Sequence, residues 1–501
     1  MPTPPRVNQA GGLALLRAHP VLGKVQALLT DADGPLYLVG GALRDACLGR
    51  EPLDLDFAGP GAIEIARRFA AANRAHMVML HELPPIARVP VYMPGASQAF
   101  ILDFCALRAP TIEADLAARD FTINAVALNL HDFALLDPTG GLDDLRAGVV
   151  RAVGASAFAA DPVRCVRAYR FCAALDFRLA EQTREWLRAA APGIAQVEGQ
   201  RVGDELLRLL ESPHAAATIR QMDADGVLSH LLPELEDGRA MDQPGFHHLS
   251  VHAHAIEALS AMEAILNSPE TLLPRSGAIT AEYLRRPRMR PLLLMAALLH
   301  DVGKPACHTR EPEGRIRFTG HPAVGATIAA RILQRLAWPA RIRDGVVALV
   351  AHHMRVFDLA GTAIDGGSAP GDIGRRISMG AIRRMFRHVH GHEPGLMLMA
   401  LADSHASRGP AKHAGYDDAL AIVCDQMLRG YIEYTTLQAP EPLLTGKDLI
   451  AAGFAPGPIF STLLQAVEES RSEGHVSNKQ QALDLARRLA RGRAGADETK
   501  E

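Results

Sequence analysis

Hydrophobic and polar positions follow one pattern in the first third of the chain and another in the rest. Short apolar runs predict strands at residues 36–39, 54–58 and 99–106, and apolar positions at helical spacing predict a helix at 63–73. The proline-rich segment 81–95 predicts a loop. A mixture of strands and helices is typical of an α+β region.

From about residue 155 onward, the apolar positions recur at helical spacing almost throughout. A chain of 501 residues is too long for one hydrophobic core. We therefore expect a mixed head, a helical neck and body, a second helical domain and a helical tail. Their expected ranges are 30–150, 151–240, 245–410 and 411–493.

Composition excludes several classes of protein. The net charge of −3 gives no global basic field, so any surface for nucleic acid must be local. No apolar run approaches the roughly 18 residues that span a bilayer, and the N-terminus lacks the pattern of a signal peptide. The six cysteines are scattered without a CxxC pair, which favours a reducing compartment. We expect a cytoplasmic protein with no membrane contact; the oligomeric state stays open.

The first candidate for chemistry is Asp54-Leu55-Asp56. Side chains two apart in a strand point the same way, so the two carboxylates repel each other unless a cation lies between them. Oxygen ligands suit Mg²⁺, and the upstream Gly40-Gly41 turn lets backbone amides approach a phosphate. The pattern predicts Mg²⁺-dependent nucleotidyl transfer by Asp54 and Asp56, with Asp103 as a candidate third carboxylate that activates the attacking hydroxyl.

The second candidate is a set of histidines and aspartates in the third region. His300-Asp301 ends an apolar helix predicted at 292–299. Imidazoles and a carboxylate from several helices suit a divalent transition metal that activates water against a phosphoester. His254 is preferred to His252, and His247 and His248 lie close by as alternatives. The expected ligands are His254, His300, Asp301, His321, His352, His353 and Asp403.

An ordered set of motifs resembles a known family, the class II tRNA nucleotidyltransferases and bacterial poly(A) polymerases, over residues of about 30–240. The motifs are Gly40–Asp45, Asp54–Asp56, Arg119–Ala125, Asp137–Leu145 and Asp161–Ala168. The resemblance implies a polymerase-β-type head followed by helical neck, body and tail. Residues 245–410 resemble the HD phosphohydrolase superfamily.

The resemblance also implies which residues bind the nucleotide. They are Gly40, Gly41, Arg44, Asp45, Arg119, Asp120, Asn124, Asp161, Arg164 and Arg167. Among these, Asp161 and Arg164 are expected to share one helix face and to read the base. The chain departs from the family pattern at Ala160, where a glutamate is usual, and at Ala118, where a second arginine is usual. Residues 80–89 also lack the family's Arg-Phe-Gly-Thr pattern.

Local basic positions predict contacts with RNA. Arg383, Arg384 and Arg387 gather on one helical face, and Lys447 follows Gly446 before a helix start, a position that favours phosphate. The segment containing Lys447 resembles the tail of CCA-adding enzymes that carry an HD domain.

These expectations describe an enzyme that uses Mg²⁺, CTP and ATP to add C and A to the 3′ end of tRNA. It is fused to an HD module that holds a divalent transition metal and hydrolyses 2′,3′-cyclic or 2′-phosphate ends. Three alternatives stay open: a poly(A) polymerase, a split-pathway enzyme that adds only CC or only A, and an HD phosphohydrolase whose head only binds RNA.

Overall fold

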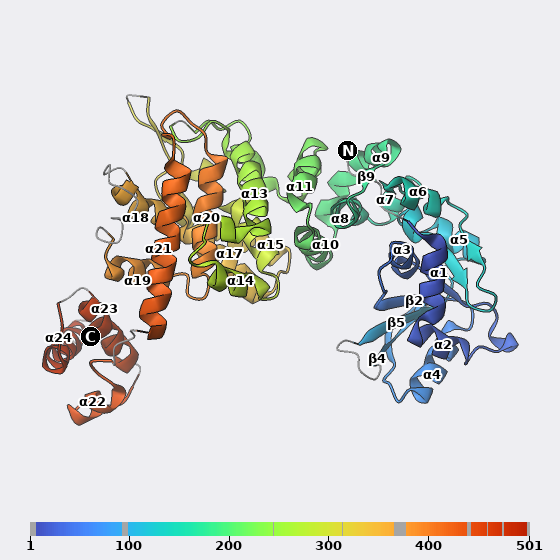
Figure 1. Cartoon of the computed structure of the whole chain (residues 1–501), viewed down its shortest axis with the longest axis horizontal. Coiled ribbons are helices and arrows are strands. Elements are labelled where there is room, and N and C mark those ends of the chain that lie inside the picture. The colour runs from blue at the N-terminus through green and yellow to red at the C-terminus, as the bar shows by residue number, and fades with distance from the viewer. Residues whose placement is uncertain are drawn as a thin grey trace. The chain divides into compact units, whose positions relative to one another are not determined.

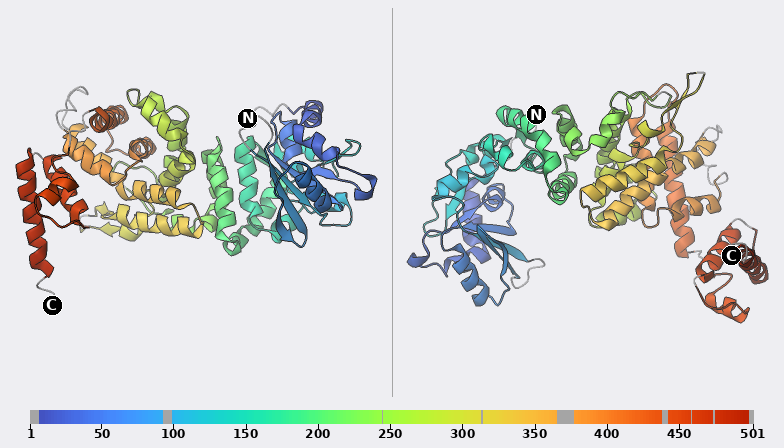
Figure 2. Two further views of the ribbon diagram at one scale, coloured as in Figure 1. Left: turned by 90° about the horizontal axis from the view of Figure 1, so that it is seen from below. Right: turned by 180° about the vertical axis from the view of Figure 1, so that it is seen from behind.

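The computed structural model describes residues 7–92, 99–243, 245–312, 314–364, 377–437, 442–457, 459–472 and 475–497. The chain divides into two compact units. The first comprises residues 1–237 together with 331–339, and the second comprises 238–330 together with 340–501. Figure 1 and Figure 2 show that the long strands belong to the N-terminal part, drawn in blue, and that helices make up the green to red remainder.

A seven-stranded mixed sheet forms the head. Its strand order is β3-β4-β5-β2-β1-β6-β7. Strands β2 and β5 pair in parallel, and the other neighbours pair antiparallel. The strands are β1 (Tyr37–Val39), β2 (Asp54–Ala58), β3 (Val78–Glu82), β4 (Pro85–Val91), β5 (Phe100–Cys105), β6 (Ala127–Asn129) and β7 (Leu135–Leu136).

Alternation along these strands separates the core from the charged residues. Helices α1 (Gln9–Ala18), α2 (Pro20–Gln26), α3 (Gly41–Cys47) and α4 (Ala62–Ala72) share one hydrophobic core with the strands. Leu55, Phe57, Leu102 and Phe104 are fully buried in that core. Because successive side chains point to opposite faces, the aspartates of β2 and β5 lie on the other side of the sheet.

The predicted strands and the helix at 63–73 are confirmed by β1, β2, β5 and α4. The loop predicted at 81–95 is wrong over its described part, because β3 and β4 form a hairpin there. Ala87 and Val89 alternate into the core, and this period-two burial outweighs the prolines, which strands tolerate at their first residue and near an edge. Residues 93–95 of that prediction lie outside the described ranges.

The rest of the first unit is helical, as predicted, apart from the two-residue strands β8 (Val149–Val150) and β9 (Arg178–Leu179). A short 3₁₀ turn, Thr122–Asn124, precedes β6. The helices are α5 (Ile112–Ala117), α6 (Gly141–Ala147), α7 (Ser156–Ala160), α8 (Arg164–Leu175), α9 (Glu181–Ala190), α10 (Gly199–Glu211), α11 (Ala215–Ala224) and α12 (Leu228–Leu231).

The second unit is a helical bundle with a small hairpin, β10 (Thr309–Arg310) and β11 (Ile316–Arg317). Helices α13, α15, α17 and α20 pack together, and α15 and α20 are buried along nearly their whole length. The helices are α13 (Val251–Asn267), α14 (Gly277–Arg285), α15 (Met289–Leu299), α16 (His321–Arg335), α17 (Ala340–His352), α18 (Met354–Ile364), α19 (Met379–Arg387), α20 (Glu393–Ala406) and α21 (Tyr416–Leu437). The last turn of α16, from residue 331 onward, belongs to the first unit.

Three more helices follow, α22 (Gly446–Ala451), α23 (Ile459–Ser472) and α24 (Lys479–Asp497), around a core of their own that includes Leu449 and Leu463. The α+β fold class predicted for the chain, with a mixed head and helical remainder, is therefore confirmed. Among the helices of the described residues, none combines the length and apolar character that crossing a bilayer requires. All six cysteines are free.

Candidate functional site

A cavity of about 620 Å³ lies in the first unit, where the turn after β1 meets the start of β2. Two of the residues that sequence analysis proposed for the head, Asp103 and Asp161, do not line it among the described residues. The proposed residues that do line it are Gly40, Gly41, Arg44, Asp45, Asp54, Asp56, Arg119, Asp120, Asn124, Arg164 and Arg167.

The turn after β1 brings the backbone against the carboxylate of Asp56. Gly40 has φ +78°, a conformation that favours glycine, and a Cβ there would lie 3.0 Å from Asp56 Oδ2. Burial, reinforced by the charges of Asp103 and Asp54, raises the pKa of Asp56 to about 6. A divalent cation between Asp54 and Asp56 would relieve this repulsion, so the residues present fit the Mg²⁺ that sequence analysis expected.

A hydrogen-bonded network joins the proposed nucleotide-binding residues. Arg44 donates to both carboxylate oxygens of Asp45, at 3.0 and 2.9 Å, and to Asn124 Oδ1 at 2.7 Å. Asn124 donates to Asp120 at 3.1 Å, and Arg167 donates to Asp120 at 3.3 Å. Burial opposes the charge of Asp120, but Arg167 and Asn124 outweigh it and hold the pKa of that carboxyl below its usual value. The network preorganises cationic groups at the cavity wall.

The network includes three residues that the sequence did not suggest, namely Glu205, Arg170 and Phe171. Glu205 on α10 is buried and accepts from Arg167 at 2.7 Å and from Arg170 at 2.5 Å. Phe171 lies beneath two guanidinium groups, 4.1 Å from that of Arg170 and 4.9 Å from that of Arg44. The spacing of Arg167 and Arg170 on α8 was a usable signal, since residues three apart share a helix face. Nothing in the sequence distinguishes Glu205 from a surface glutamate.

The expectation that Asp161 and Arg164 share a helix face is corrected. Helix α7 ends at Ala160 and α8 begins at Arg164, so Asp161 lies between them in extended backbone. The reason is Pro162, which disfavours helical backbone at the residue before it. Asp161 pairs with Arg201 at 2.6 Å, whereas Arg164 lines the cavity. The ion pair that Asp161 makes in this structure is therefore with Arg201 on α10.

Asp103 lies beside Asp56, in register across β5 and β2. Both of its oxygens accept from Arg88, at 2.8 Å each. The structure therefore places the expected third carboxylate next to the other two, but in an ion pair.

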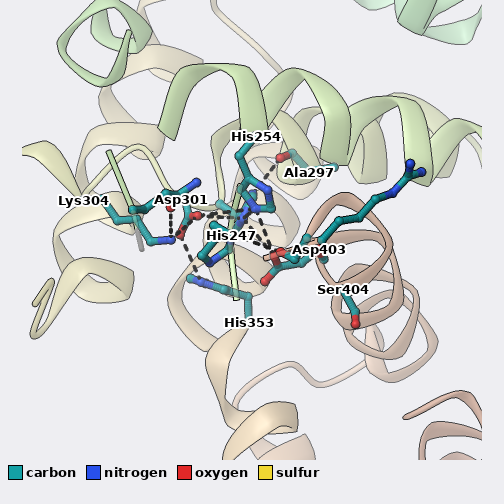
Figure 3. A network of polar contacts seen from close by, with 12 residues as sticks. His247, His254, Ala297, Asp301, Lys304, His353, Asp403 and Ser404 are labelled. Atoms are coloured by element: carbon teal, nitrogen blue, oxygen red, sulfur yellow. Dashed lines mark hydrogen bonds and ion pairs between the residues drawn. The ribbon is translucent and has the colours of Figure 1, made fainter. Parts of the chain in front are cut away.

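A second cluster lies inside the helical bundle (Figure 3). Its members come from α13, the end of α15, the start of α16, the residue after α17, and α20. Every member has less than one tenth of its surface exposed. The members are His254, His300, Asp301, His321, His353 and Asp403.

The ring nitrogens of this cluster are arranged for a cation. His300, His321 and His353 each point Nδ1 at a backbone carbonyl three residues earlier, at 2.8 to 2.9 Å. A carbonyl only accepts, so Nδ1 carries the proton and Nε2 of a neutral ring has a free lone pair. Yet His321 Nε2 lies 3.2 Å from His353 Nε2, and burial lowers the pKa of His353 to about 3. Two such lone pairs at this distance repel unless a cation lies between them.

Asp301 connects two groups of converging ligands. Its Oδ2 lies 3.1 Å from His300 Nε2, and its Oδ1 lies 3.3 Å from His321 Nε2 and 3.7 Å from His353 Nε2. Burial disfavours protonation of His300, but Asp301 and Asp403 outweigh it and raise the pKa of that ring to about 9. The geometry therefore has room for two cations, with Asp301 between them.

One expected ligand is placed elsewhere, and an alternative takes part. Within the described residues, no group of converging ligands includes His352, whose ring lies 5.0 Å from that of His388. Successive residues at the end of a helix point about 100° apart, and in this structure His353 is the one of the two that joins a group of converging ligands among the described residues. His247 does converge with His254 and Asp403.

This placement predicts different results for adjacent histidines. His353→Ala should remove the cation held by the group of Asp301, His321 and His353, because one of its three ligands is lost. His352→Ala should leave the metal content unchanged. Metal analysis of the two purified proteins checks both; equal losses in the two would contradict the placement.

A cavity of about 780 Å³ opens onto this cluster. Its wall carries basic side chains that the sequence did not suggest as part of the second site. Lys304 Nζ lies 2.6 Å from Asp301 Oδ2, and Arg315 and Arg317 of the hairpin also line the cavity. The chain packs closely here, because a Cβ on Gly303 would lie 2.3 Å from the carbonyl oxygen of His321. Cationic side chains next to a metal cluster suit an anionic substrate.

Of the residues predicted to contact RNA, Lys447 is exposed but Arg383 is engaged with other protein groups. Arg383 donates to the hydroxyl of Tyr434 at 3.1 Å and lies 3.5 Å from Glu468, so its guanidinium contacts protein. Lys447 is exposed, but the start of α22 is already capped by Asp448 and Thr445. The roles of Arg384 and Arg387 stay predictions.

Three protein families match the chain in order. The Poly A polymerase head domain matches residues 36–151, the probable RNA and SrmB-binding site of polymerase A matches 176–238, and the HD domain matches 253–406. The first match includes Asp54 and Asp56, and the third includes His254, Asp301 and Asp403, whereas Arg164 and Arg167 of the head cavity lie between the first and second matches.

Two curated relatives cover nearly the whole chain, and a third covers about three quarters of it. The A-adding tRNA nucleotidyltransferase of Deinococcus radiodurans is 36% identical over 92% of this chain and 96% of its own. The CC-adding enzyme of Synechocystis is 30% identical over 91% and 93%. The multifunctional CCA protein of an Azoarcus species is 32% identical over 74% and 84%.

Solved structures share the fold. The CCA-adding enzyme of Thermotoga maritima complexed with tRNA has a TM-score of 0.58 and 22% identity, covering 95% of this chain and 98% of that one. A CCA-adding enzyme with CTP has a TM-score of 0.61 and 21% identity, over 94% and 96%. The curated relatives and the family matches show that the chain belongs to the tRNA nucleotidyltransferase family of transferases, with a poly(A) polymerase-type head and an HD domain.

Proposed function

We propose that the protein adds C and A to the 3′ end of tRNA, using CTP and ATP. The observation that carries this proposal is the head cavity, which Asp54 and Asp56 line together with the hydrogen-bonded network of Arg44, Asn124 and Asp120. The names of the relatives that cover most of the chain support tRNA as the substrate.

In the proposed reaction, the cavity residues bind and orient the nucleotide. Asp54 and Asp56 would hold Mg²⁺, which would supply Lewis-acid stabilisation of the reacting phosphate and of the attacking 3′ hydroxyl. Arg44 and the backbone of the Gly40-Gly41 turn hold the triphosphate, and Asp45 and Asn124 hold the Arg44 guanidinium in place. Fixed cationic groups also stabilise the charge that moves onto the pyrophosphate.

A second candidate is the addition of A alone, because the relative with 36% identity is an A-adding enzyme. The test uses three tRNA transcripts, ending before the CCA sequence, after C, and after CC. Each is incubated with labelled CTP or ATP. We expect CTP to label the first two and ATP the third. Labelling of only the third transcript, by ATP, would establish the A-adding reaction, and long A tails would overturn the tRNA assignment.

We further propose that the second centre is a phosphohydrolase that acts on 2′,3′-cyclic or 2′-phosphate ends of RNA. The cluster around Asp301 is expected to bind divalent transition-metal ions, which supply an activated water when bound. Lys304, Arg315 and Arg317 would bind the phosphate in the adjoining cavity. Release of inorganic phosphate from a 2′-phosphorylated tRNA end tests this proposal; no release with any divalent metal would refute it.

A further inference from the structure

Arg88 and Asp103 stand in one row with Asp56 on the head sheet. Arg88 pairs with Asp103 across β4 and β5, and Asp103 pairs with Asp56 across β5 and β2. Their sequence neighbours Ala87 and Leu102 are fully buried, so the three charged side chains share the opposite face of the sheet. The row ends at the proposed cation site.

Arg88 occupies both oxygens of Asp103. Its Nε donates to Oδ1 and its NH2 donates to Oδ2, each at 2.8 Å. Two parallel hydrogen bonds of this kind are the strongest arrangement of a guanidinium and a carboxylate. The Asp103 side chain is 19% exposed and that of Arg88 is 45% exposed, so the acid lies deeper than its partner. The pair takes up the lone pairs of Asp103 that face Arg88 and fixes the orientation of this carboxylate.

The two members of the pair act on Asp56 with opposite sign. Asp103 brings a second negative charge in register beside Asp56, and Arg88 brings a positive charge in register beside Asp103. Arg88 interacts with Asp54 as well as with Asp56 and Asp103. Without Arg88, three carboxylates would gather here around one centre.

We propose that Arg88 is a positioning residue that keeps Asp103 out of the cation site, so that Asp54 and Asp56 alone bind the divalent ion. The inference rests on the proposed function, because it takes these two aspartates as the ligands. Mg²⁺ keeps several waters and is commonly held by one or two carboxylates plus substrate phosphates. A site limited to two carboxylates therefore leaves positions for the nucleotide triphosphate.

The test is a Mn²⁺ titration of the full-length protein without nucleotide, with the unbound ion measured by electron paramagnetic resonance. The Mn²⁺ binding that belongs to the head site is the part of the total binding that is lost in the Asp54→Asn/Asp56→Asn variant. Arg88→Met should bind Mn²⁺ at the head at least about threefold more tightly, because it frees a carboxylate. Asp103→Asn should bind it at least about threefold more weakly, because an unpaired guanidinium remains.

Two further variants separate charge from structure. Arg88→Met/Asp103→Asn should return to within about twofold of the wild type, because its local charge is again balanced. Arg88→Lys keeps the charge and should also stay within about twofold. Arg67→Met is the matched control, since Arg67 pairs with Glu64 on α4 and its side chain is 61% exposed.

Unchanged or weaker binding in Arg88→Met overturns the inference, as does a double variant that stays far from the wild type. If Arg88→Met does not fold, Asp103→Asn decides, and unchanged Mn²⁺ affinity there overturns it. If Asp54→Asn/Asp56→Asn loses no Mn²⁺ site, the ligand assignment of the proposed function fails instead.

Discussion

Replacing Asp54 and Asp56 with asparagine should lower the rate of nucleotide addition by about 10³-fold or more, because a bound cation supplies several kcal/mol of transition-state stabilisation and about 4 kcal/mol corresponds to that factor. Asparagine keeps the shape of the side chain and removes the charge that holds the ion. The measurement is incorporation of labelled CTP and ATP into tRNA transcripts that lack the CCA end.

The same variants separate lost chemistry from lost folding. Burial and the neighbouring carboxylates raise the pKa of Asp56 to about 6. The folded state therefore binds this proton more tightly than the unfolded state, and the stabilisation present below the ordinary aspartate pKa is lost as pH rises through about 6. At neutral pH in EDTA, Asp56→Asn should thus be at least as stable as the wild type by thermal unfolding.

A suitable control replaces a carboxylate that is outside the cavity. Asp143→Asn changes an exposed residue of α6 whose partner is Arg146 in the same helix. It should leave nucleotide addition unchanged. Full activity of Asp54→Asn/Asp56→Asn would remove these aspartates from the mechanism, and equal loss in Asp143→Asn would point to a general effect on folding.

The parts of the head that follow from local pattern could be predicted from the sequence. Asp54 and Asp56 share one face because strand periodicity is two, and β2 has the bounds that the apolar run predicted. Long-range partners could not be predicted in this way. Glu205 approaches Arg167 only because α10 packs on α8, and no local signal encodes that contact.

The second centre shows a similar limit at a finer scale. Its histidines and aspartates were visible as motifs, but choosing between His352 and His353 requires the end of α17 to within one residue, and helix ends are the least certain feature of a sequence pattern. The choice also depends on which carbonyl anchors Nδ1. For His353 this is the carbonyl of Val350, and the contact between them forms only when the chain is folded.

Asp301→Asn should remove nearly all divalent metal from the second centre, because this carboxylate belongs to both the His254–His300 group and the His321–His353 group. Changing a residue that only supports a metal ligand costs about 10- to 100-fold in affinity, so loss of a shared ligand should cost at least that much. Metal analysis of the purified protein, after loading with a transition metal and desalting, gives the measurement.

Two comparisons make this result specific. Asp403→Asn should lose only the ion of the His254–His300 group, because Asp403 lies 3.0 Å from His254 Nε2 and 3.7 Å from His300 Nε2. Asp358→Asn, on the wall of the same cavity but outside the cluster, should keep the full metal content. The metal content should therefore be highest in Asp358→Asn, lower in Asp403→Asn and lowest in Asp301→Asn.

The two activities should respond independently to the same substitution. Asp301→Asn should abolish phosphate release from a 2′-phosphorylated tRNA end, while nucleotide addition to an intact tRNA continues at the wild-type rate, because Asp54 and Asp56 lie in the other compact unit. A variant that loses its metal and keeps releasing phosphate would assign the hydrolysis to other residues. If Asp301→Asn keeps its metal, the cluster binds metal ions without Asp301, and the assignment of Asp301 as a shared ligand is wrong.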